Sequence, residues 1–192
     1  MLGKKKLTQA QFISYAGVLS ALSIVLIFIE VPYPLVPYLK LDFSEVVTLI
    51  AVSLNFGLAI VVALVKASLT FLIKPGAIMI GHVAMLVGSL SLIVGYSVAS
   101  KKFSKIVSLI FASIVFCVVM GTSNYFFIDP FYMGTSYQEL ATSTFALPFG
   151  SDSSNHSYLM YNIVTYLPFN MAKMAVVSTA FYFISNRLEK EQ

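Results

Sequence analysis

Charged side chains are scarce in this sequence. They make up 10% of its 192 residues, whereas hydrophobic residues make up 58%. A soluble domain carries about 25% charged residues, so this chain has too few of them to cover a globule with a wetted surface. An unusually apolar soluble protein is the alternative interpretation. The composition favours a multi-pass integral membrane protein with one domain over 1–192 and no room for a second.

Cysteine is almost absent as well. The single Cys117 stands in the apolar run IVFCVV, so the chain has no disulfide framework and no cysteine-based metal site. His82 has no second histidine or cysteine at metal-ligand spacing, and a hydrogen-bonded interior histidine is its simplest interpretation. We therefore expect neither a metal nor another cofactor.

Several motifs of catalysis and energy conversion are also missing. The sequence has no G-x-x-x-x-G-K-[ST] loop, so the chain should not hydrolyse ATP. A membrane protease or a lipid-modifying transferase would need a nucleophile–base pair or a carboxylate dyad, and neither stands out. An autonomous channel or carrier is a further alternative, but the chain shows no inverted repeat. The amino terminus is basic and polar, and the apolar run behind it is too long for a cleaved signal peptide.

Long apolar segments dominate what is present. They predict an all-α integral membrane protein, a compact bundle of six transmembrane helices, because lipid forces the backbone to bond within each segment. Each segment is long enough, or nearly so, to cross a hydrocarbon core of about 30 Å, and the second is the shortest. The predicted helices cover roughly 10–30, 44–56, 57–74, 78–100, 106–128 and 158–186, and a long outer loop covers 129–157.

The charges are distributed unevenly between the two sides of this predicted bundle. The cytoplasmic side would hold the basic residues beside the apolar segments, by the positive-inside rule. These are Lys4, Lys5, Lys6, Lys101, Lys102, Lys105, Arg187 and Lys190. The other side would hold Glu30, Asp42, Glu45, Asp129, Glu139 and Asp152, with Lys40 and Lys74. The pattern predicts that both termini are cytoplasmic, and it explains the net charge of +4 without a nucleic-acid partner.

Two outer connections are rich in aromatic residues. The first, 30–45, contains three prolines and two tyrosines, and the second is the long loop 129–157. Loops of that length are often functional lids, and the aromatic content argues against disorder. An aromatic belt at the membrane interface is the competing interpretation.

Polar residues inside the apolar segments are the candidates for function. A lysine at the centre of a spanning helix costs about 2.5–3.5 kcal/mol, so Lys66 and Lys173 need a partner or a cavity. Glu45 and Asp42 are the candidate partners of Lys66. Lys173 shares a helix face with Asn170, and this face suits an oxygen-rich ligand. Snorkelling is the alternative for Lys173, because Pro168 suggests that its helix begins nearby.

Small residues form a stripe on the first helix. The pairs Ala16/Ser20 and Gly17/Ala21 have small-xxx-small spacing, which lets another helix approach closely. The partner helix could belong to this chain or to another. Asn124, near the end of the fifth segment, similarly suits either a helix–helix hydrogen bond or a ligand contact.

Three local patterns together indicate a family. PYPLVPYLKLDFSEV at 32–46 is similar to a proline-rich loop followed by K-[LI]-D-F-S-[DE]-[VI]. NYFFIDPFY at 124–132 is similar to N-Y-F-x-x-x-P-x-Y, and PFNMAK at 168–173 to P-F-N-x-x-K. These motifs, their order and their spacing resemble the substrate-binding S components of energy-coupling factor (ECF) vitamin transporters, in the branch that contains the riboflavin subunit. The resemblance covers nearly the whole chain.

The resemblance implies a non-catalytic subunit of the bacterial plasma membrane that captures a vitamin on its outer face. The implied partners are a transmembrane coupling subunit (T component) and two cytoplasmic ATPases, with toppling of the S component to release the vitamin inside. The small-residue stripe would dock the coupling subunit. The matching motifs imply that the vitamin pocket includes Leu39, Lys40, Asp42, Asn124, Asn170 and Lys173.

One departure concerns the substrate. Riboflavin subunits usually have a pattern similar to G-E-x-x-N early in the fourth helix. The corresponding GHVAML of this chain keeps the glycine as Gly81, but His82 replaces the glutamate and Met85 or Leu86 replaces the asparagine. We count Gly81 and His82 as candidate binding residues. Riboflavin is slightly favoured because aromatic residues are plentiful. Pantothenate, or a vitamin of the pyrimidine or pyridoxine type, is the alternative, and a small membrane enzyme is a lower one.

Overall fold

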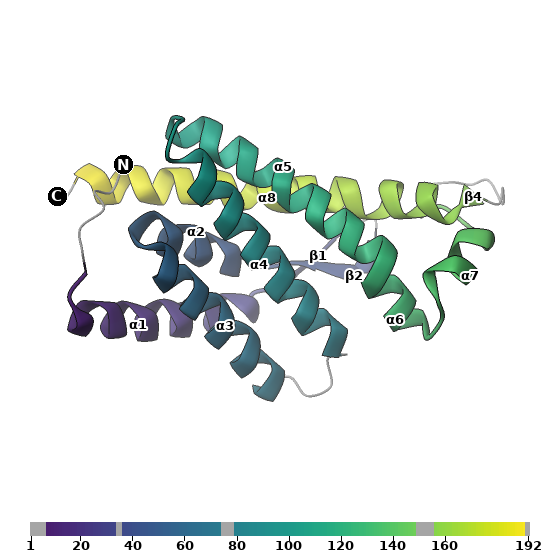
Figure 1. Cartoon of the computed structure of the whole chain (residues 1–192), viewed down its shortest axis with the longest axis horizontal. Helices are drawn as coiled ribbons and strands as arrows, with labels where there is room; N and C mark the ends of the chain where they lie inside the picture. The colour runs from purple at the N-terminus through teal and green to yellow at the C-terminus, as the bar shows by residue number, and fades with distance from the viewer. Residues whose placement is uncertain (1–6, 34–35, 74–78, 149–155, 191–192) are drawn as a thin grey trace.

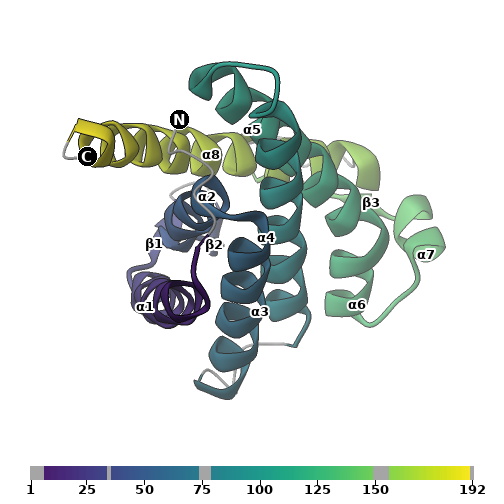
Figure 2. The same cartoon turned by 60° about the vertical axis from the view of Figure 1, so that its left-hand side comes forward.

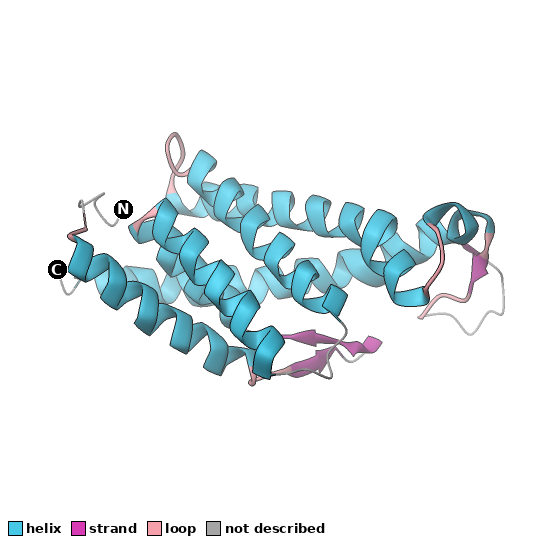
Figure 3. Ribbon diagram, turned by 60° about the horizontal axis from the view of Figure 1, so that its bottom comes forward, coloured by secondary structure: helices cyan, strands magenta, loops and turns pink. Residues whose placement is uncertain are grey.

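The protein is almost entirely helical, which confirms the predicted all-α class. The computed structural model describes residues 7–33, 36–73, 79–148 and 156–190. Its main helices are α1 (Gln9–Ile27), α2 (Ser44–Leu54), α3 (Phe56–Ile73), α4 (Met79–Ala99), α5 (Lys105–Ser123) and α8 (Tyr158–Lys190) (Figure 1). The start of α1 and the end of α8 lie at the same end of the bundle (Figures 1 and 3).

The predicted count of six spans is not confirmed. Within the described ranges, five helical stretches are long and apolar enough to cross a membrane: α1, α3, α4, the continuous stretch Lys105–Met133, and α8 as far as Leu188. Helix α2 has 11 residues, so it extends about 16 Å and is too short to span. Figure 2 shows why it is nonetheless central, because α2 lies inside the bundle with α1, α3, α4 and α8 around it.

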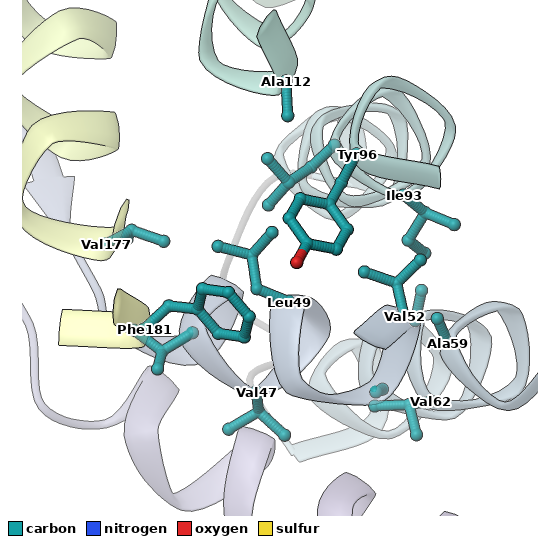
Figure 4. Close-up of a cluster of buried hydrophobic side chains, with 14 of the residues drawn as sticks. Val47, Leu49, Val52, Ala59, Val62, Ile93, Tyr96, Ala112, Val177 and Phe181 are labelled. Atoms are coloured by element: carbon teal, nitrogen blue, oxygen red, sulfur yellow. The ribbon is translucent and has the colours of Figure 1, made fainter. Parts of the chain in front are cut away.

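The core of the bundle surrounds this short helix. Most residues of α2 are buried. Its Val47, Leu49 and Val52 pack with Ala59 and Val62 of α3 (Figure 4). Helices α4, α5 and α8 complete the same cluster with Ile93, Tyr96, Ala112, Val177 and Phe181. The rings of Tyr96 and Phe181 meet edge to face, with centroids 5.7 Å apart. One apolar core therefore joins α2 with α3, α4, α5 and α8.

Helices α4 and α5 approach each other closely at a glycine. A Cβ atom built on Gly95 would lie 3.0 Å from the Cα of Ala112 and 3.2 Å from the Cβ of Val115. Because real Cβ atoms seldom come so near to backbone, only glycine fits this crossing without a shift of one helix.

The two connections that were predicted to face outward contain regular structure. Strands β1 (Val31–Tyr33) and β2 (Val36–Leu41) form an antiparallel hairpin within the first. The region predicted as one long loop contains helices α6 (Asp129–Met133) and α7 (Tyr137–Thr142) and the paired strands β3 (Thr144–Phe145) and β4 (His156–Ser157). The loop expectation was therefore wrong for the described part of 129–157.

Aromatic rings hold the second connection against the bundle. Phe126 contacts Tyr137 of α7 with centroids 5.3 Å apart, and Phe145 of β3 stacks on Tyr161 of α8 at 5.2 Å. Other aromatic residues in this region, including Phe127 and Phe131, are exposed. Some of these rings thus pack inward while others face out, so neither the lid nor the belt interpretation accounts for all of them.

Pro168 does not mark a helix start, contrary to the sequence expectation. Helix α8 begins ten residues earlier, at Tyr158, and continues through Pro168. A proline removes one backbone donor, but in membrane helices neighbouring groups re-satisfy the freed carbonyl, so the helix can continue.

Candidate functional site

A cavity of about 680 Å³ opens at the hairpin end of the bundle, between β2, α2, α4, α6 and α8. Its volume lies in the usual range for small-molecule sites. All eight predicted binding residues line it: Leu39, Lys40, Asp42, Gly81, His82, Asn124, Asn170 and Lys173. The structure thus brings together residues that are far apart in the sequence, while their role in binding stays a prediction.

Lys173 and Asp42 form an ion pair in the cavity wall. The Lys173 Nζ donates to Asp42 Oδ2 at 2.7 Å, and Asp42 Oδ1 accepts from the backbone N–H of Ser44 at 3.0 Å and from its hydroxyl at 2.5 Å. Burial alone would raise the pKa of Asp42, but the Lys173 ammonium, with a smaller effect of Lys66, lowers this pKa well below its usual range. The snorkelling interpretation was wrong, because the ammonium is partnered inside the chain.

A second ion pair lies behind the cavity. Lys66 is fully buried and donates to Glu45 Oε1 at 2.9 Å, which selects Glu45 from its two candidate partners. Ser89 also donates to Glu45 Oε1, at 2.8 Å. Glu45 lines the cavity, so this pair places one acidic side chain in the cavity wall with its lysine partner behind it.

Three buried polar atoms in the wall lack hydrogen-bond partners among the described residues. They are Glu45 Oε2, His82 Nε2 and Asn170 Nδ2. His82 was expected to be a hydrogen-bonded interior residue, and this was wrong at Nε2. Its ring meets Phe71 edge to face instead, with centroids 5.6 Å apart. An unsatisfied buried group costs about 1–3 kcal/mol, so a ligand that pairs with these atoms would recover that free energy.

The sequence reasoning missed a further polar group at the α6 end of the cavity. Asp129 is buried, lines the cavity and accepts from Tyr166 Oη at 2.7 Å, Tyr158 Oη at 3.3 Å and Asn162 Nδ2 at 3.4 Å. The spacing of Asn162, Tyr166, Asn170 and Lys173 follows one face of a helix, and this signal could have revealed the site.

A π-helical turn, η1 (Asn124–Ile128), joins α5 to α6 and positions Asn124 and Asp129. The Asp129 N–H donates to the carbonyl of Asn124, five residues earlier. Pro130 follows and has no N–H to continue an α-helical ladder. Such turns are frequent at functional sites, and here both Asn124 and Asp129 line the cavity. The Asn124 backbone carbonyl also accepts from Tyr158 Oη at 3.4 Å.

The predicted docking stripe divides between two environments. Ser20 is buried and Ala16 packs against the core, so this pair serves packing within the chain. Gly17 and Ala21 are exposed, and a Cβ built on Gly17 meets no atom within 4 Å. Among the four residues of the stripe, Gly17 and Ala21 are therefore the two that another protein could contact.

The donor set has the character of a binding site. Among the described residues, no group of three or more histidine, cysteine or acidic side chains is placed to hold a metal ion. The wall combines paired charges, unsatisfied amide, imidazole and carboxylate atoms, and apolar side chains such as Phe116 and Phe169. A small molecule with aromatic and polar parts would fit this arrangement.

Comparisons with known proteins agree with this arrangement. The sequence model of the substrate-specific component of ECF transporters matches residues 11–185. The riboflavin transporter RibU of Staphylococcus aureus (strain TCH60) is 33% identical over 196 residues, which cover 98% of this chain and 96% of that protein. The riboflavin transporter FmnP of Bacillus subtilis (strain 168) is 30% identical over 181 residues, covering 90% and 89%.

A solved structure gives the same result at the level of the fold. It is described as the S component of a bacterial ECF transporter, is 30% identical and superposes with a TM-score of 0.75 over 95% of this chain and 98% of that one. The chain therefore belongs to the family of substrate-specific (S) components of ECF transporters, which are membrane-embedded substrate-binding proteins rather than enzymes.

Proposed function

We propose that this S component binds riboflavin in the cavity at the hairpin end. The observation that carries the proposal is the convergence of the unpaired Glu45 Oε2, His82 Nε2 and Asn170 Nδ2 on one vitamin-sized cavity. The ring system of riboflavin offers carbonyl oxygens to the amide and a ring N–H to the carboxylate. The names of the two relatives support the same substrate.

We also propose a six-segment arrangement with both termini in the cytoplasm, in which α2 crosses only half of the bilayer and the hairpin completes its path. The exposed basic residues support it: Lys101 and Lys102 follow α4, and Arg187 lies in the last turn of α8, near the end of the bundle that holds the termini. Glu30, Asp42, Asp129 and Glu139 lie toward the other end. By the positive-inside rule, this asymmetry supports a cavity that faces outward.

As an S component, the chain should deliver its ligand to an assembly. We propose a T component and two cytoplasmic ATPases as its partners, with ATP hydrolysis supplied by the ATPases and no cofactor on this chain besides the bound vitamin. The exposed Gly17/Ala21 surface of α1 supports contact with a partner helix.

The substrate is tested by calorimetric titration of the detergent-purified protein with riboflavin, pantothenate, a pyrimidine vitamin and a pyridoxine vitamin. We expect riboflavin to bind at least 100-fold more tightly than the others and to be recovered with the protein by absorbance and mass spectrometry. Tighter binding of pantothenate would replace the substrate but retain the S-component function.

Two further outcomes would contradict the function itself. Turnover of a lipid or peptide without any bound vitamin would indicate an enzyme. Uptake of riboflavin into liposomes by this chain alone, without ATPases, would indicate an autonomous carrier.

A further inference from the structure

The charges around the cavity are paired with one exception. Lys40 Nζ lies 2.8 Å from Glu30 Oε2, Lys173 pairs with Asp42, and Lys66 pairs with Glu45. Asp129 has three hydrogen-bond donors but no cationic partner in the part of the chain that the structure describes. Among the described residues, the α6 end of the cavity therefore has an acceptor without a matching positive charge.

The geometry of Asp129 leaves room for another donor. A carboxylate offers roughly four acceptor positions on its two oxygens. The Tyr158 and Asn162 bonds both go to Oδ2, whereas Tyr166 alone donates to Oδ1. Because Asp129 and Tyr166 both line the cavity, the open position on Oδ1 is available to a molecule inside it.

The two polar regions of the cavity lie at different depths along α8. Tyr166 and Lys173 are seven residues apart, which is about 10 Å along a helix. A ligand that reaches both regions must be elongated. The Lys173 region, with Asn170 and Glu45, offers both a donor and an acceptor, whereas the Asp129 region accepts hydrogen bonds and has no described cation.

We propose that Asp129 is a specificity-determining residue that accepts hydrogen bonds from the hydroxylated side chain of the ligand. The inference rests on the proposed function, since riboflavin combines a ring system with a chain of hydroxyl groups. The ring lies toward Lys173 and Asn170, and the chain extends to Asp129. Buried carboxylates form stronger hydrogen bonds with hydroxyl donors than neutral acceptors do, so this contact contributes to affinity.

The same arrangement disfavours a phosphate at the end of the chain. A phosphate is acceptor-rich and negatively charged, and it would meet the Asp129 carboxyl with no described cation beside it. Asp129 therefore selects the free vitamin over its phosphate ester.

The test compares three flavins on one protein background. Riboflavin, lumiflavin (the same ring with a methyl group in place of the hydroxylated chain) and riboflavin 5′-phosphate are titrated against the wild type and Asp129→Asn. We expect the substitution to weaken riboflavin binding about 10-fold or more and lumiflavin binding less than threefold. The phosphate ester should bind the wild type more weakly than riboflavin, and Asp129→Asn should narrow that difference.

Two variants guard against a folding artefact. Tyr166→Phe removes the hydroxyl that donates to Asp129 Oδ1, and it should also lower riboflavin affinity, by a smaller factor than Asp129→Asn. If Asp129→Asn is not recovered folded, Tyr166→Phe takes its place in the comparison of the flavins. Glu139→Gln makes the same chemical change on an exposed carboxylate outside the cavity, and glutamine preserves the capping box of α7. Glu139→Gln should change the affinity for neither riboflavin nor lumiflavin.

The outcomes separate the inference from the proposed function. Equal weakening of riboflavin and lumiflavin in a variant that stays monodisperse, or no weakening at all, overturns the role of Asp129 while riboflavin binding by the wild type stands. A wild type that does not bind riboflavin overturns the proposed function, and the inference with it.

Discussion

The two lysines inside spanning helices, Lys66 and Lys173, are each paired with an acidic side chain. Lys66 and Glu45 are both nearly inaccessible, and their attraction, together with the Ser89 hydroxyl, offsets the cost of removing them from water. Removal of one partner should therefore be more harmful than removal of both.

The first prediction follows from that pair. Lys66→Met leaves Glu45 charged and unmatched, and we expect it to destabilise the fold by about 3–5 kcal/mol. The double variant Lys66→Met/Glu45→Gln should recover much of the loss. Apparent midpoints of thermal unfolding in detergent measure both, and a double variant no more stable than the single one would contradict the expectation.

A second prediction concerns the cavity wall. Asn170→Ala removes the unsatisfied amide donor, and we expect riboflavin affinity to fall about 10-fold, equivalent to about 1.4 kcal/mol. Lys173→Met should weaken binding further, because it also releases Asp42 from the ion pair. Lys102→Met, at an exposed site outside the cavity, is the control. Wild-type affinity in both cavity variants would contradict the assigned pocket.

Sequence reasoning reached the costly residues but only some of their partners. The need of Lys66 for an acidic partner was predictable because few acids lie in or beside apolar segments, but the sequence left Glu45 and Asp42 as alternatives and the structure selects Glu45. The pairing of Lys173 with Asp42 was not, because 131 positions separate them and only the packed hairpin brings them together. Asp129 was also missed, because its donors lie 29 to 37 positions further along the chain and only the packing of α8 against α6 and η1 brings them to it.

At the scale of elements, the crossing of α4 and α5 depends on Gly95. We predict that Gly95→Ala forces the Cβ against Ala112 and destabilises the protein by about 1–3 kcal/mol. Gly121→Ala is the matched control, because a Cβ there meets nothing within 4 Å and the residue is helical. It should be neutral or stabilising by up to about 1 kcal/mol. Equal unfolding midpoints for both variants would contradict the close crossing.

Another prediction at this scale concerns α1. Gly17→Leu places a bulky side chain on the exposed Gly17/Ala21 surface without meeting the bundle, so riboflavin affinity should be unchanged. Co-purification with the T component should fall several-fold. Val18→Leu, on a neighbouring exposed position, is the control. Intact assembly of the Gly17 variant would count against docking through this surface.

The elements also show where periodicity and composition stop being informative. Apolar length predicted helices because lipid leaves few alternatives for the backbone. It could not reveal the hairpin or α7, which depend on local pairing and capping. Proline was a poor boundary signal in α8, since the helix continues through Pro168, which removes one backbone donor.

At the scale of the whole molecule, orientation can be tested directly. In a Cys117→Ala background, a membrane-impermeant maleimide should label Glu139→Cys in intact cells, because α7 is exposed on the proposed outer side. Lys102→Cys, in the connection between α4 and α5, should react only after permeabilisation. The reverse pattern would invert the proposed topology and place the cavity on the inside.

The brevity of α2 has a consequence for the whole architecture. A sixth helix of full length would have filled the bundle from end to end. Helix α2 instead starts at the cavity, and Glu45 in its first turn lines the cavity wall. The cavity occupies the space into which a longer sixth helix would have extended. A bound nutrient would occupy this space, so the loaded protein should unfold at a higher temperature than the empty one, and the gain in stability should rise with the logarithm of the ligand concentration above the dissociation constant.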